Sequence, residues 1–375
     1  MSRTHPDRMP AALARIGPLD ARAAAAAASH LDRLTKPPGS LGRLEELLIQ
    51  LAGITGVAAP RLEQRAIVVF AADHGVAARG VSAYPSEVTA QMVANFLAGG
   101  AAINALTGRA DAEVIVVDVG VASPISEPAT TVRARRTRLV SSPIRRGTRD
   151  LSVGPALTRE ETIAAIDIGF DIADEVRGEG TTIVGLGEMG IGNTTAASAI
   201  VAALTGPPVR SVTGRGTGAD EDTYERKVRL IERALGRDAL EPADPIGILA
   251  SVGGLEIAAL TGFILGASAA RLPVILDGFT TGAAALVAAR LCPDLPPRLI
   301  AGHRSPEPGH AVILDELGLR PLLDLGMRLG EGSGAALALL LVDAACRVRE
   351  EMATFAAAGV AGPVSADGDR HRSPW

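Results

Sequence analysis

Two glutamates flanked by glycines are the residues of this 375-residue chain best suited to chemistry. Glu188 lies within the segment GEMG at 187–190, and Glu331 lies within GEG at 330–332. A carboxylate held between glycines lies close to the backbone and to any ligand bound there. Burial raises the pKa of such a carboxylate and makes it a competent general base. The sequence therefore predicts proton chemistry at these glutamates, and the alternative is an acid in a surface turn.

The glycine-rich segment around Glu188 also predicts a binding site for an anion. It follows the apolar run Thr181–Val184, contains Gly190 and Asn193, and leads into an alanine-rich helix at 196–204. Free amides at a helix N-terminus favour phosphate. No lysine follows the last glycine, so this is not a P-loop, and an acid inside the loop disfavours a dinucleotide pyrophosphate. A tight turn without a ligand remains the alternative.

The elements that must position these groups are predicted from short apolar runs. The runs show no alternation, which is typical of parallel strands buried on both faces. They lie at 66–70, 114–117, 181–184, 209–212, 273–276, 298–301 and 321–325. Helical patterns separate most of them, so we expect an α/β fold with an open, doubly wound, mostly parallel sheet flanked by helices. Its crevice should collect the strand-end residues Asp73, Glu188, Asp277, His303 and Glu331.

Composition narrows the class of protein further. The chain carries a net charge of −5 and few aromatic residues (Trp 1, Tyr 2, Phe 6), which argues against nucleic-acid binding. Its two cysteines form no C-x-x-C pair, and residues 1–10 have no apolar signal region, so we expect a cytoplasmic protein. The longest apolar stretch, Ile257 to Ala270, is too short for a membrane span and predicts a buried helix.

Four regions are expected along the chain. Residues 1–60 form an N-terminal helical segment belonging to a smaller domain, and residues 61–330 form the sheet domain with the crevice. Residues 331–358 form a C-terminal helix that packs with the smaller domain, and 359–375 form a disordered tail. The stretch Arg133–Arg149, with seven arginines, is interpreted as a solvated excursion with short β segments rather than a polyanion site.

Metal and nucleophilic-serine chemistry are not expected. His303, Glu307 and His310 are interrupted by prolines, so they cannot share a helix face as in H-E-x-x-H. The pair Asp73-His74 is more typical of a turn, and Ser333 does not lie in G-x-S-x-G. We therefore predict no metal and no cofactor.

Seven ordered segments together resemble one enzyme family, the nicotinate-nucleotide:dimethylbenzimidazole phosphoribosyltransferases of cobalamin biosynthesis. The resemblance runs from about Leu34 to Ala345. Its motifs are LTKPPGSLGRLE from Leu34, ADHGV from Ala72, YPSEVTAQMVANFLAGGAAIN from Tyr84, GEMGIGNTTAAS from Gly187, GRGTG from Gly214, GHRSPEPGH from Gly302 and LGMRLGEGSGAALA from Leu325. The resemblance implies transfer of the phosphoribosyl group of nicotinate mononucleotide to 5,6-dimethylbenzimidazole, which gives α-ribazole 5′-phosphate and nicotinate.

The resemblance also implies roles for individual residues. Glu331 matches the family's general base, and Glu188 matches its second active-site glutamate, near the ribose. Candidates for the nucleotide and its phosphate are Gly190, Asn193, Gly216, Lys227, Asp277 and Ser305. Candidates for the acceptor pocket are Tyr84, Gln91, Met327 and Leu329. Some family members carry serine where Tyr84 aligns, so the preferred acceptor base stays open. A homodimer that binds these two small molecules, and neither nucleic acid nor membrane, is the expected assembly.

Two other functions remain as hypotheses. A nucleotide-binding sensor without chemistry would have no need of both Glu188 and Glu331. A dinucleotide dehydrogenase on a similar sheet is disfavoured by the acid inside the glycine-rich loop.

Overall fold

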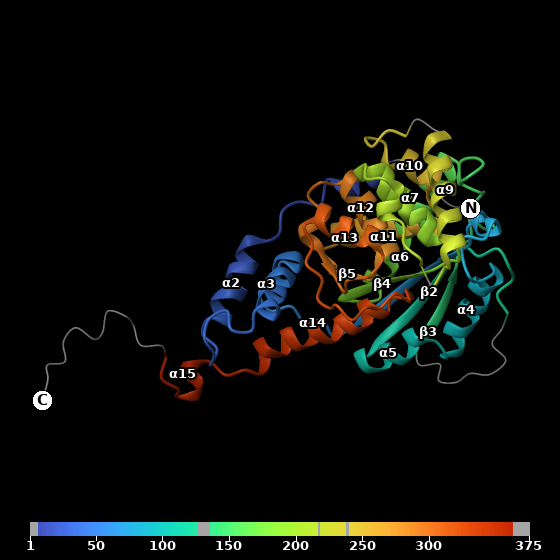
Figure 1. Ribbon diagram of the computed structural model, residues 1–375. Helices are drawn as coiled ribbons and strands as arrows, with labels where there is room; N and C mark the ends of the chain where they lie inside the picture. The colour runs from blue at the N-terminus through green and yellow to red at the C-terminus, as the bar shows by residue number, and fades with distance from the viewer. Residues whose placement is uncertain (1–6, 127–135, 217, 238–239, 363–375) are drawn as a thin grey trace, which may run out of the picture. The chain divides into compact units, whose positions relative to one another are not determined.

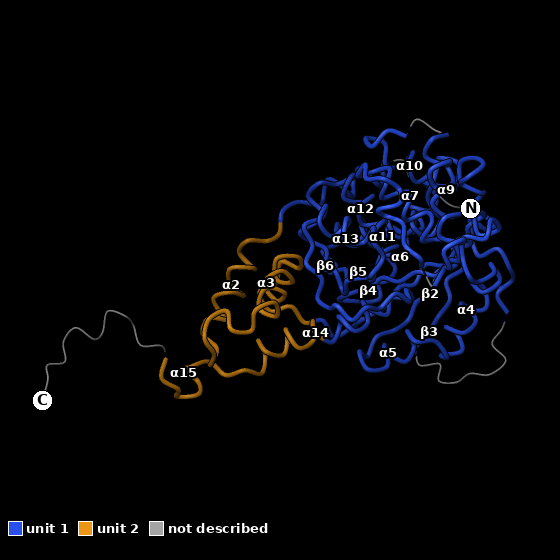
Figure 2. Tube along the Cα trace, in the orientation of Figure 1, with its two compact units in different colours: residues 1–18, 62–340 blue, residues 19–61, 341–375 orange. Residues whose placement is uncertain are grey.

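The computed structural model describes residues 7–126, 136–216, 218–237 and 240–362. The expectations for the first six residues, for most of the tail and for part of the Arg133–Arg149 stretch lie outside these residues. The chain divides into two compact units (Figure 2): residues 1–18 with 62–340, and residues 19–61 with 341–375. The segment expected at 1–60 is thus divided at Pro18, and the residues before that point belong with the sheet.

The first unit is built on a six-stranded sheet in which every pair of neighbouring strands is parallel. The strands are β1 (Arg65–Ala72), β2 (Ala112–Gly120), β3 (Thr137–Ser141), β4 (Ile183–Met189), β5 (Val274–Leu276) and β6 (Leu299–Ala301). Their order is β3-β2-β1-β4-β5-β6. The order reverses direction between β1 and β4, which is where ligands bind in doubly wound sheets. The predicted α/β fold is confirmed.

Helices cover both faces of this sheet (Figure 1). Packed against the sheet on one side lies α11 (Leu255–Ala269), while α4 (Glu87–Ala98) and α5 (Ala102–Ala110) lie against the other. The remaining helices of this unit are α1 (Arg8–Leu13), α6 (Arg159–Gly178), α7 (Asn193–Thr205), α8 (Val209–Val212), α9 (Glu221–Arg237), α10 (Pro245–Val252), α12 (Phe279–Leu291) and α13 (Pro308–Leu317), with the short 3-10 turns η1 (Gly75–Arg79) and η2 (Pro296–Arg298).

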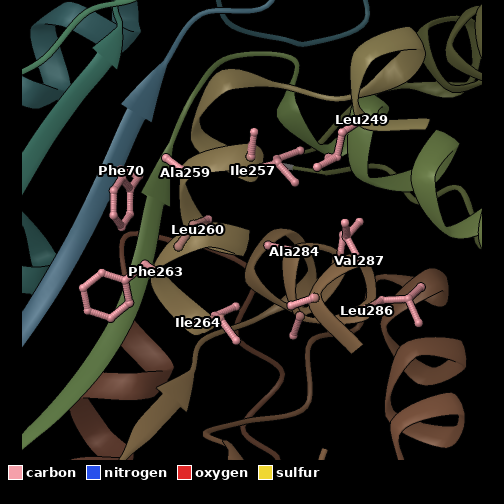
Figure 3. Packing of buried hydrophobic residues seen from close by; sticks show 14 of the residues in the cluster. Phe70, Leu249, Ile257, Ala259, Leu260, Phe263, Ile264, Ala284, Leu286 and Val287 are labelled. Carbon is pink, nitrogen blue, oxygen red and sulfur yellow. The ribbon is translucent and has the colours of Figure 1, made fainter. Parts of the chain in front are cut away.

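The core centres on α11, in which every residue is buried, as predicted for the apolar stretch from Ile257. Its side chains meet β1 and α12 (Figure 3), and the rings of Phe70 and Phe263 pack edge to face at 5.9 Å. A Cβ at Gly262 would lie 1.9 Å from the carbonyl oxygen of Ile166 in α6. Glycine therefore allows α6 and α11 to pack with their backbones in contact.

The second unit is helical. It contains α2 (Ala21–Leu31), α3 (Arg43–Thr55), α15 (Phe355–Ala358) and the end of α14 (Ser333–Glu351), a helix that begins in the first unit. Asp20 caps α2 by accepting the N–H of Ala23 at 2.9 Å. The turn before α3 is held by a buried ion pair in which Lys36 Nζ lies 2.8 Å from Glu45 Oε1.

Three strand predictions need correction. The run Val209–Val212 forms the short helix α8, because Pro207 and Pro208 precede it and proline favours a helix start. The run 321–325 forms no strand, and an isolated bridge joins Leu323 to His303. The predicted turn at Gly185–Gly187 is part of β4, which ends at Met189.

The arginine-rich stretch 133–149 lies among carboxylates rather than forming a free basic surface in its described part. Four arginines of the basic stretch pair with carboxylates: Arg136 contacts Asp111, Arg138 contacts Glu113, Glu175 and Glu179, and Arg145 and Arg149 contact Glu161. Among the described residues, no helix combines the length and the apolar character that crossing a membrane requires.

Candidate active site

A pocket opens where β4, β5 and β6 end, beside the point at which the strand order reverses. Its walls come from the strand-end segments and from two loops. They are lined by Glu188, Met189, Gly190, Ile191, Asn193, Thr194, Gly216, Asp277, Gly278, Phe279, Thr280, His303, Ser305, Glu307, Arg328, Leu329 and Gly330. Eight residues predicted from the sequence meet here: Glu188, Gly190, Asn193, Gly216, Asp277, His303, Ser305 and Leu329.

The turn from β4 into α7 forms one wall of the pocket. Gly192 adopts a left-handed backbone (φ 96), which turns the chain into the helix beginning at Asn193. A Cβ at Gly190 would lie 2.3 Å from the carbonyl oxygen of Ala72, so this turn lies directly against the end of β1. The N-terminus of α7, with Asn193 and Thr194, therefore lines the pocket and brings the positive end of the helix dipole, which favours a phosphate.

Glu188 stands at the end of β4 in a crowded acidic environment. Its Oε2 accepts a short hydrogen bond from the side-chain amide of Asn193. Burial, together with the negative charges of Asp277 and Glu256, raises the pKa of Glu188 to about 8. This carboxyl group is therefore protonated at neutral pH and can donate a hydrogen bond.

Lys227 supplies positive charge from behind the pocket wall. It extends from α9, is 1% exposed, and its Nζ donates to Thr194 Oγ1 at 2.8 Å and to the carbonyl oxygen of Gly214 at 3.2 Å. Burial lowers the pKa of Lys227 to about 8. The carboxylate of Glu307 lies nearby and accepts the N–H of Gly216 at 2.8 Å. The Lys227 ammonium, through its contact with Thr194, and the α7 dipole thus lie on the same side of the pocket.

Glu331 is carried by a glycine-rich loop that lies directly on β4. A Cβ at Gly187 would lie 2.5 Å from the amide nitrogen of Gly332 and 2.6 Å from the carbonyl carbon of Glu331. Three successive residues, Gly330, Glu331 and Gly332, have left-handed backbones (φ 84, 63 and 86). A side chain in the strand beneath would displace this loop, so the glycines of GLGEM and GEGSG are needed together.

The carboxylate of Glu331 points to the start of α5. Its Oε2 accepts the backbone N–H of Ile103 at 3.3 Å. Burial raises the pKa of Glu331 above its ordinary value, and the hydrogen bond from Ile103 opposes that shift. Asn104 fixes this helix start, because its Oδ1 accepts the N–H of Ala101 at 3.1 Å and its amide donates to the Phe96 carbonyl at 3.0 Å.

Asp277, immediately after β5, joins the pocket to the Glu331 loop. Its Oδ1 accepts the N–H groups of Gly334 at 2.6 Å and Ala335 at 3.2 Å, and its Oδ2 accepts that of Gly332 at 3.3 Å. The imidazole Nε2 of His303 lies 3.6 Å from Oδ1. Burial raises the pKa of Asp277 to about 7, against the opposing effect of these three backbone hydrogen bonds.

Most of the residues expected to form the acceptor pocket do not line this pocket. Leu329 lines the pocket and is 51% exposed. Tyr84 is 50% exposed, Gln91 is exposed and Met327 is half-buried, and the pocket lining contains none of these three. Of the four predicted acceptor-pocket residues, only Leu329 therefore lies at this pocket.

Several contributors were not predicted from the sequence. Thr194 and Arg328 lie within the motifs around Asn193 and Met327, so their proximity in sequence was the available signal. Glu307, which the sequence places between two histidines, holds the Gly216 loop. Ile103 had no local signal, because its backbone N–H meets Glu331 through the tertiary fold.

Asp73, a strand-end candidate, belongs to a separate buried cluster. Its Oδ2 accepts the N–H of Ala122 at 2.8 Å, and its neighbour His74 lies 2.6 Å from Glu256, measured from Nε2 to Oε1. Burial alone would lower the pKa of His74, but the charge and hydrogen bond of Glu256 raise it. Within the described parts of the chain, no group of three or more His, Cys, Asp or Glu side chains is arranged to hold a metal ion.

Comparisons with known proteins agree along nearly the whole chain. A family model described as Phosphoribosyltransferase matches residues 16–360. The nicotinate-nucleotide–dimethylbenzimidazole phosphoribosyltransferase of Chloroflexus aggregans is 57% identical over 92% of this chain and 96% of its own. The enzyme of that name from Salinispora tropica is 54% identical over 93% and 98%. A crystal structure of that enzyme from Thermus thermophilus superposes with a TM-score of 0.84, at 47% identity, over 92% of this chain and 100% of its own.

Proposed function

This chain belongs to the phosphoribosyltransferase family, and from that premise we propose that it uses nicotinate mononucleotide and 5,6-dimethylbenzimidazole as substrates. It transfers the 5-phosphoribosyl group from the first to the second and releases nicotinate. The product is α-ribazole 5′-phosphate. The observation that carries this proposal is the buried Glu331 carboxylate, whose pKa is raised, on a loop that packs on β4 directly after Gly330 of the pocket lining.

The chemistry follows from charge balance. One benzimidazole nitrogen attacks C1′ of the ribose while the C1′–N bond to the pyridinium ring breaks, and the electron pair of that bond neutralises the departing ring. Positive charge then develops on the acceptor ring. Glu331 accepts the proton from the other ring nitrogen and removes that charge. Attack opposite to the leaving group converts a β-linked nucleotide into an α-linked product.

The remaining groups of the pocket bind and orient the nucleotide. The α7 N-terminus and Lys227 attract its phosphate. Glu188, protonated at neutral pH, is placed to donate a hydrogen bond to an oxygen of the ribose or to the nucleotide beside it. Gly190, Asn193, Gly216 and Ser305 contribute the pocket wall against which the ribose phosphate lies. Leu329 on the rim contacts the acceptor ring, with Tyr84, Gln91 and Met327 contributing once the acceptor is bound.

Two further expectations belong to this proposal. The protein acts as a homodimer, which light scattering on the purified chain would test. It works in the cytoplasm, in keeping with two cysteines that form no C-x-x-C pair.

The direct test mixes the purified protein with both substrates and follows the products by chromatography and mass. Formation of α-ribazole phosphate is the expected result. Glu331→Gln should retain nucleotide binding and lose about 10²- to 10⁴-fold in turnover, whereas the exposed Glu63→Gln serves as a matched control with unchanged turnover. Nucleotide binding without nicotinate release in the wild-type protein would refute the proposal and support a sensor. Wild-type turnover by Glu331→Gln would refute the role of the base.

A further inference from the structure

The helix α14, which follows the Glu331 loop, has no side-chain cap from the residue that precedes it. Gly332 precedes the first residue of α14 and has no side chain that could accept the free amides of the first turn. The hydroxyl of Ser333 is buried without a hydrogen-bond partner. The amides of Gly332, Gly334 and Ala335 are instead accepted by Asp277, which comes from β5. A carboxylate remote in sequence thus serves as the N-cap of α14.

This use of Asp277 leaves little of its carboxylate for a substrate. The side chain is 1% exposed, and both of its oxygens accept backbone N–H groups. A buried carboxylate without such partners would be strongly unfavourable, and the N-terminus of a helix is a site that stabilises it. The contacts of Asp277 are therefore directed into the loop rather than into the pocket.

The loop needs such support because its backbone is unfavourable for a side-chain-bearing residue. Glu331 has φ 63 between two glycines that are also left-handed. A residue in this region persists only where the surroundings hold it. Beneath the loop, the N–H of Glu331 donates to the carbonyl oxygen of Glu188 at 3.3 Å. On the far side, the three hydrogen bonds to Asp277 prevent the start of α14 from relaxing.

We propose that Asp277 is a positioning residue: by holding the backbone at 332–335 it aims the Glu331 carboxylate at the N–H of the acceptor ring. The inference rests on the function proposed above and replaces the expectation that Asp277 binds substrate. A displacement of about 1 Å at a reacting group can lower a rate about 10²-fold. Loss of Asp277 therefore acts on turnover through Glu331, and leaves the phosphate-binding wall in place.

The test is a double-mutant cycle on the full-length chain with the two substrates. Asp277→Asn keeps one acceptor oxygen and replaces the other by a donor that opposes a backbone N–H. We expect its kcat to fall about 10²-fold, with the KM for nicotinate mononucleotide changed less than about threefold. In the Glu331→Gln background the same substitution should lower kcat by less than about threefold, because the base it positions is already absent.

The controls separate this inference from the proposed function. Asp315→Asn, on the exposed face of α13, is the matched control and should leave kcat unchanged. Asp277→Ala, which removes all three hydrogen bonds, should be at least as damaging as Asp277→Asn. If it fails to fold, as thermal denaturation would show, the Asn variant alone decides the cycle. Multiplicative losses in the double mutant, or a loss confined to the KM for the nucleotide, would overturn the positioning role. Absence of product from the wild-type protein would overturn the proposed function first, and this inference with it.

Discussion

Replacement of Gly187 by alanine should separate the placement of Glu331 from the rest of the site. Gly187 lies in β4, paired with Val69 of β1, and an alanine is compatible with the strand backbone. The added methyl group would point at the Glu331 loop, 2.5 Å from the amide nitrogen of Gly332 and 2.6 Å from the carbonyl carbon of Glu331. These neighbours are backbone atoms, so no rotamer change can relieve the overlap.

The size of the effect follows from these distances. Ordinary van der Waals contact begins at 3.4 Å, so the loop and the strand must separate by about 0.9 Å. A shift of about 1 Å at a reacting group lowers the rate about 10²-fold, equivalent to about 2.7 kcal/mol in the barrier. Overpacking of a well-packed site also lowers the free energy of unfolding by about 1–3 kcal/mol. We therefore expect a folded protein with a reduced melting temperature and about a hundredfold lower kcat.

The assay compares kcat, the affinity for nicotinate mononucleotide and the melting temperature. Gly178→Ala is the matched control, because no atom lies within 4 Å of the position its Cβ would take, at the end of α6. Its turnover should equal that of the wild-type protein. The affinity of Gly187→Ala for the nucleotide should change less than about threefold, since the α7 turn and Lys227 are not displaced.

Two results would refute this reasoning. Wild-type turnover by Gly187→Ala would mean that the loop does not depend on the strand beneath it. A loss of nucleotide affinity as large as the loss of kcat would mean that the whole pocket, rather than the base alone, has moved.

Three other perturbations test the electrostatics and the second unit. Glu188 is protonated at pH 6.5 because its pKa lies near 8, so Glu188→Gln should bind nicotinate mononucleotide with an affinity within about threefold of wild type at that pH. Above pH 8, calorimetry should show that the affinities of the two proteins diverge. An equal loss of affinity at both pH values would contradict the protonated state. Lys227 loses its charge as the pH rises through about 8, so the affinity of the wild-type protein for the nucleotide should weaken about tenfold across that range. Lys227→Met should bind the nucleotide more weakly and should not show this pH-dependent step. An identical pH profile in both proteins would argue against phosphate binding by Lys227. Lys36→Ala removes the cation from the buried Glu45 carboxylate, which still accepts the N–H groups of Leu41 and Gly39, and should lower the free energy of unfolding by about 1–3 kcal/mol in chemical denaturation. An unchanged unfolding midpoint would show that the ion pair is not stabilising.

The sheet was predictable because its evidence is local. Apolar runs without alternation, such as the one at 66–70, identify buried parallel strands, and helical patterns between them fix the class of fold. The strand predicted at Val209–Val212 is wrong, because four apolar residues fit a strand and a helix turn equally well and the preceding prolines decided the outcome.

The sequence identified many residues of the candidate site, but it did not reveal which of them contact one another. Glu188 and Glu331 stood out because glycines surround them, and a parallel sheet brings strand ends together. Gly185 and Gly187 favour a turn by residue type, whereas they lie in β4 beneath a loop that follows more than a hundred residues later in the chain. Asp277 and Ile103 act on Glu331 through backbone amides, and side-chain types reveal nothing about such contacts.

The packing of the Glu331 loop on Gly187 of β4 bears on how this enzyme could change its acceptor in evolution. In our proposal, Glu331 is the base, and the framework aims it through Gly187 in β4 and Asp277 after β5. The pocket rim, by contrast, includes the exposed side chain of Leu329, which lies outside helices and strands. Mutations there can therefore alter which ring is accepted without retuning the proton transfer. Under this proposal, the catalytic step and the choice of acceptor depend on different parts of the fold, and we expect single substitutions at the rim to change the preferred acceptor.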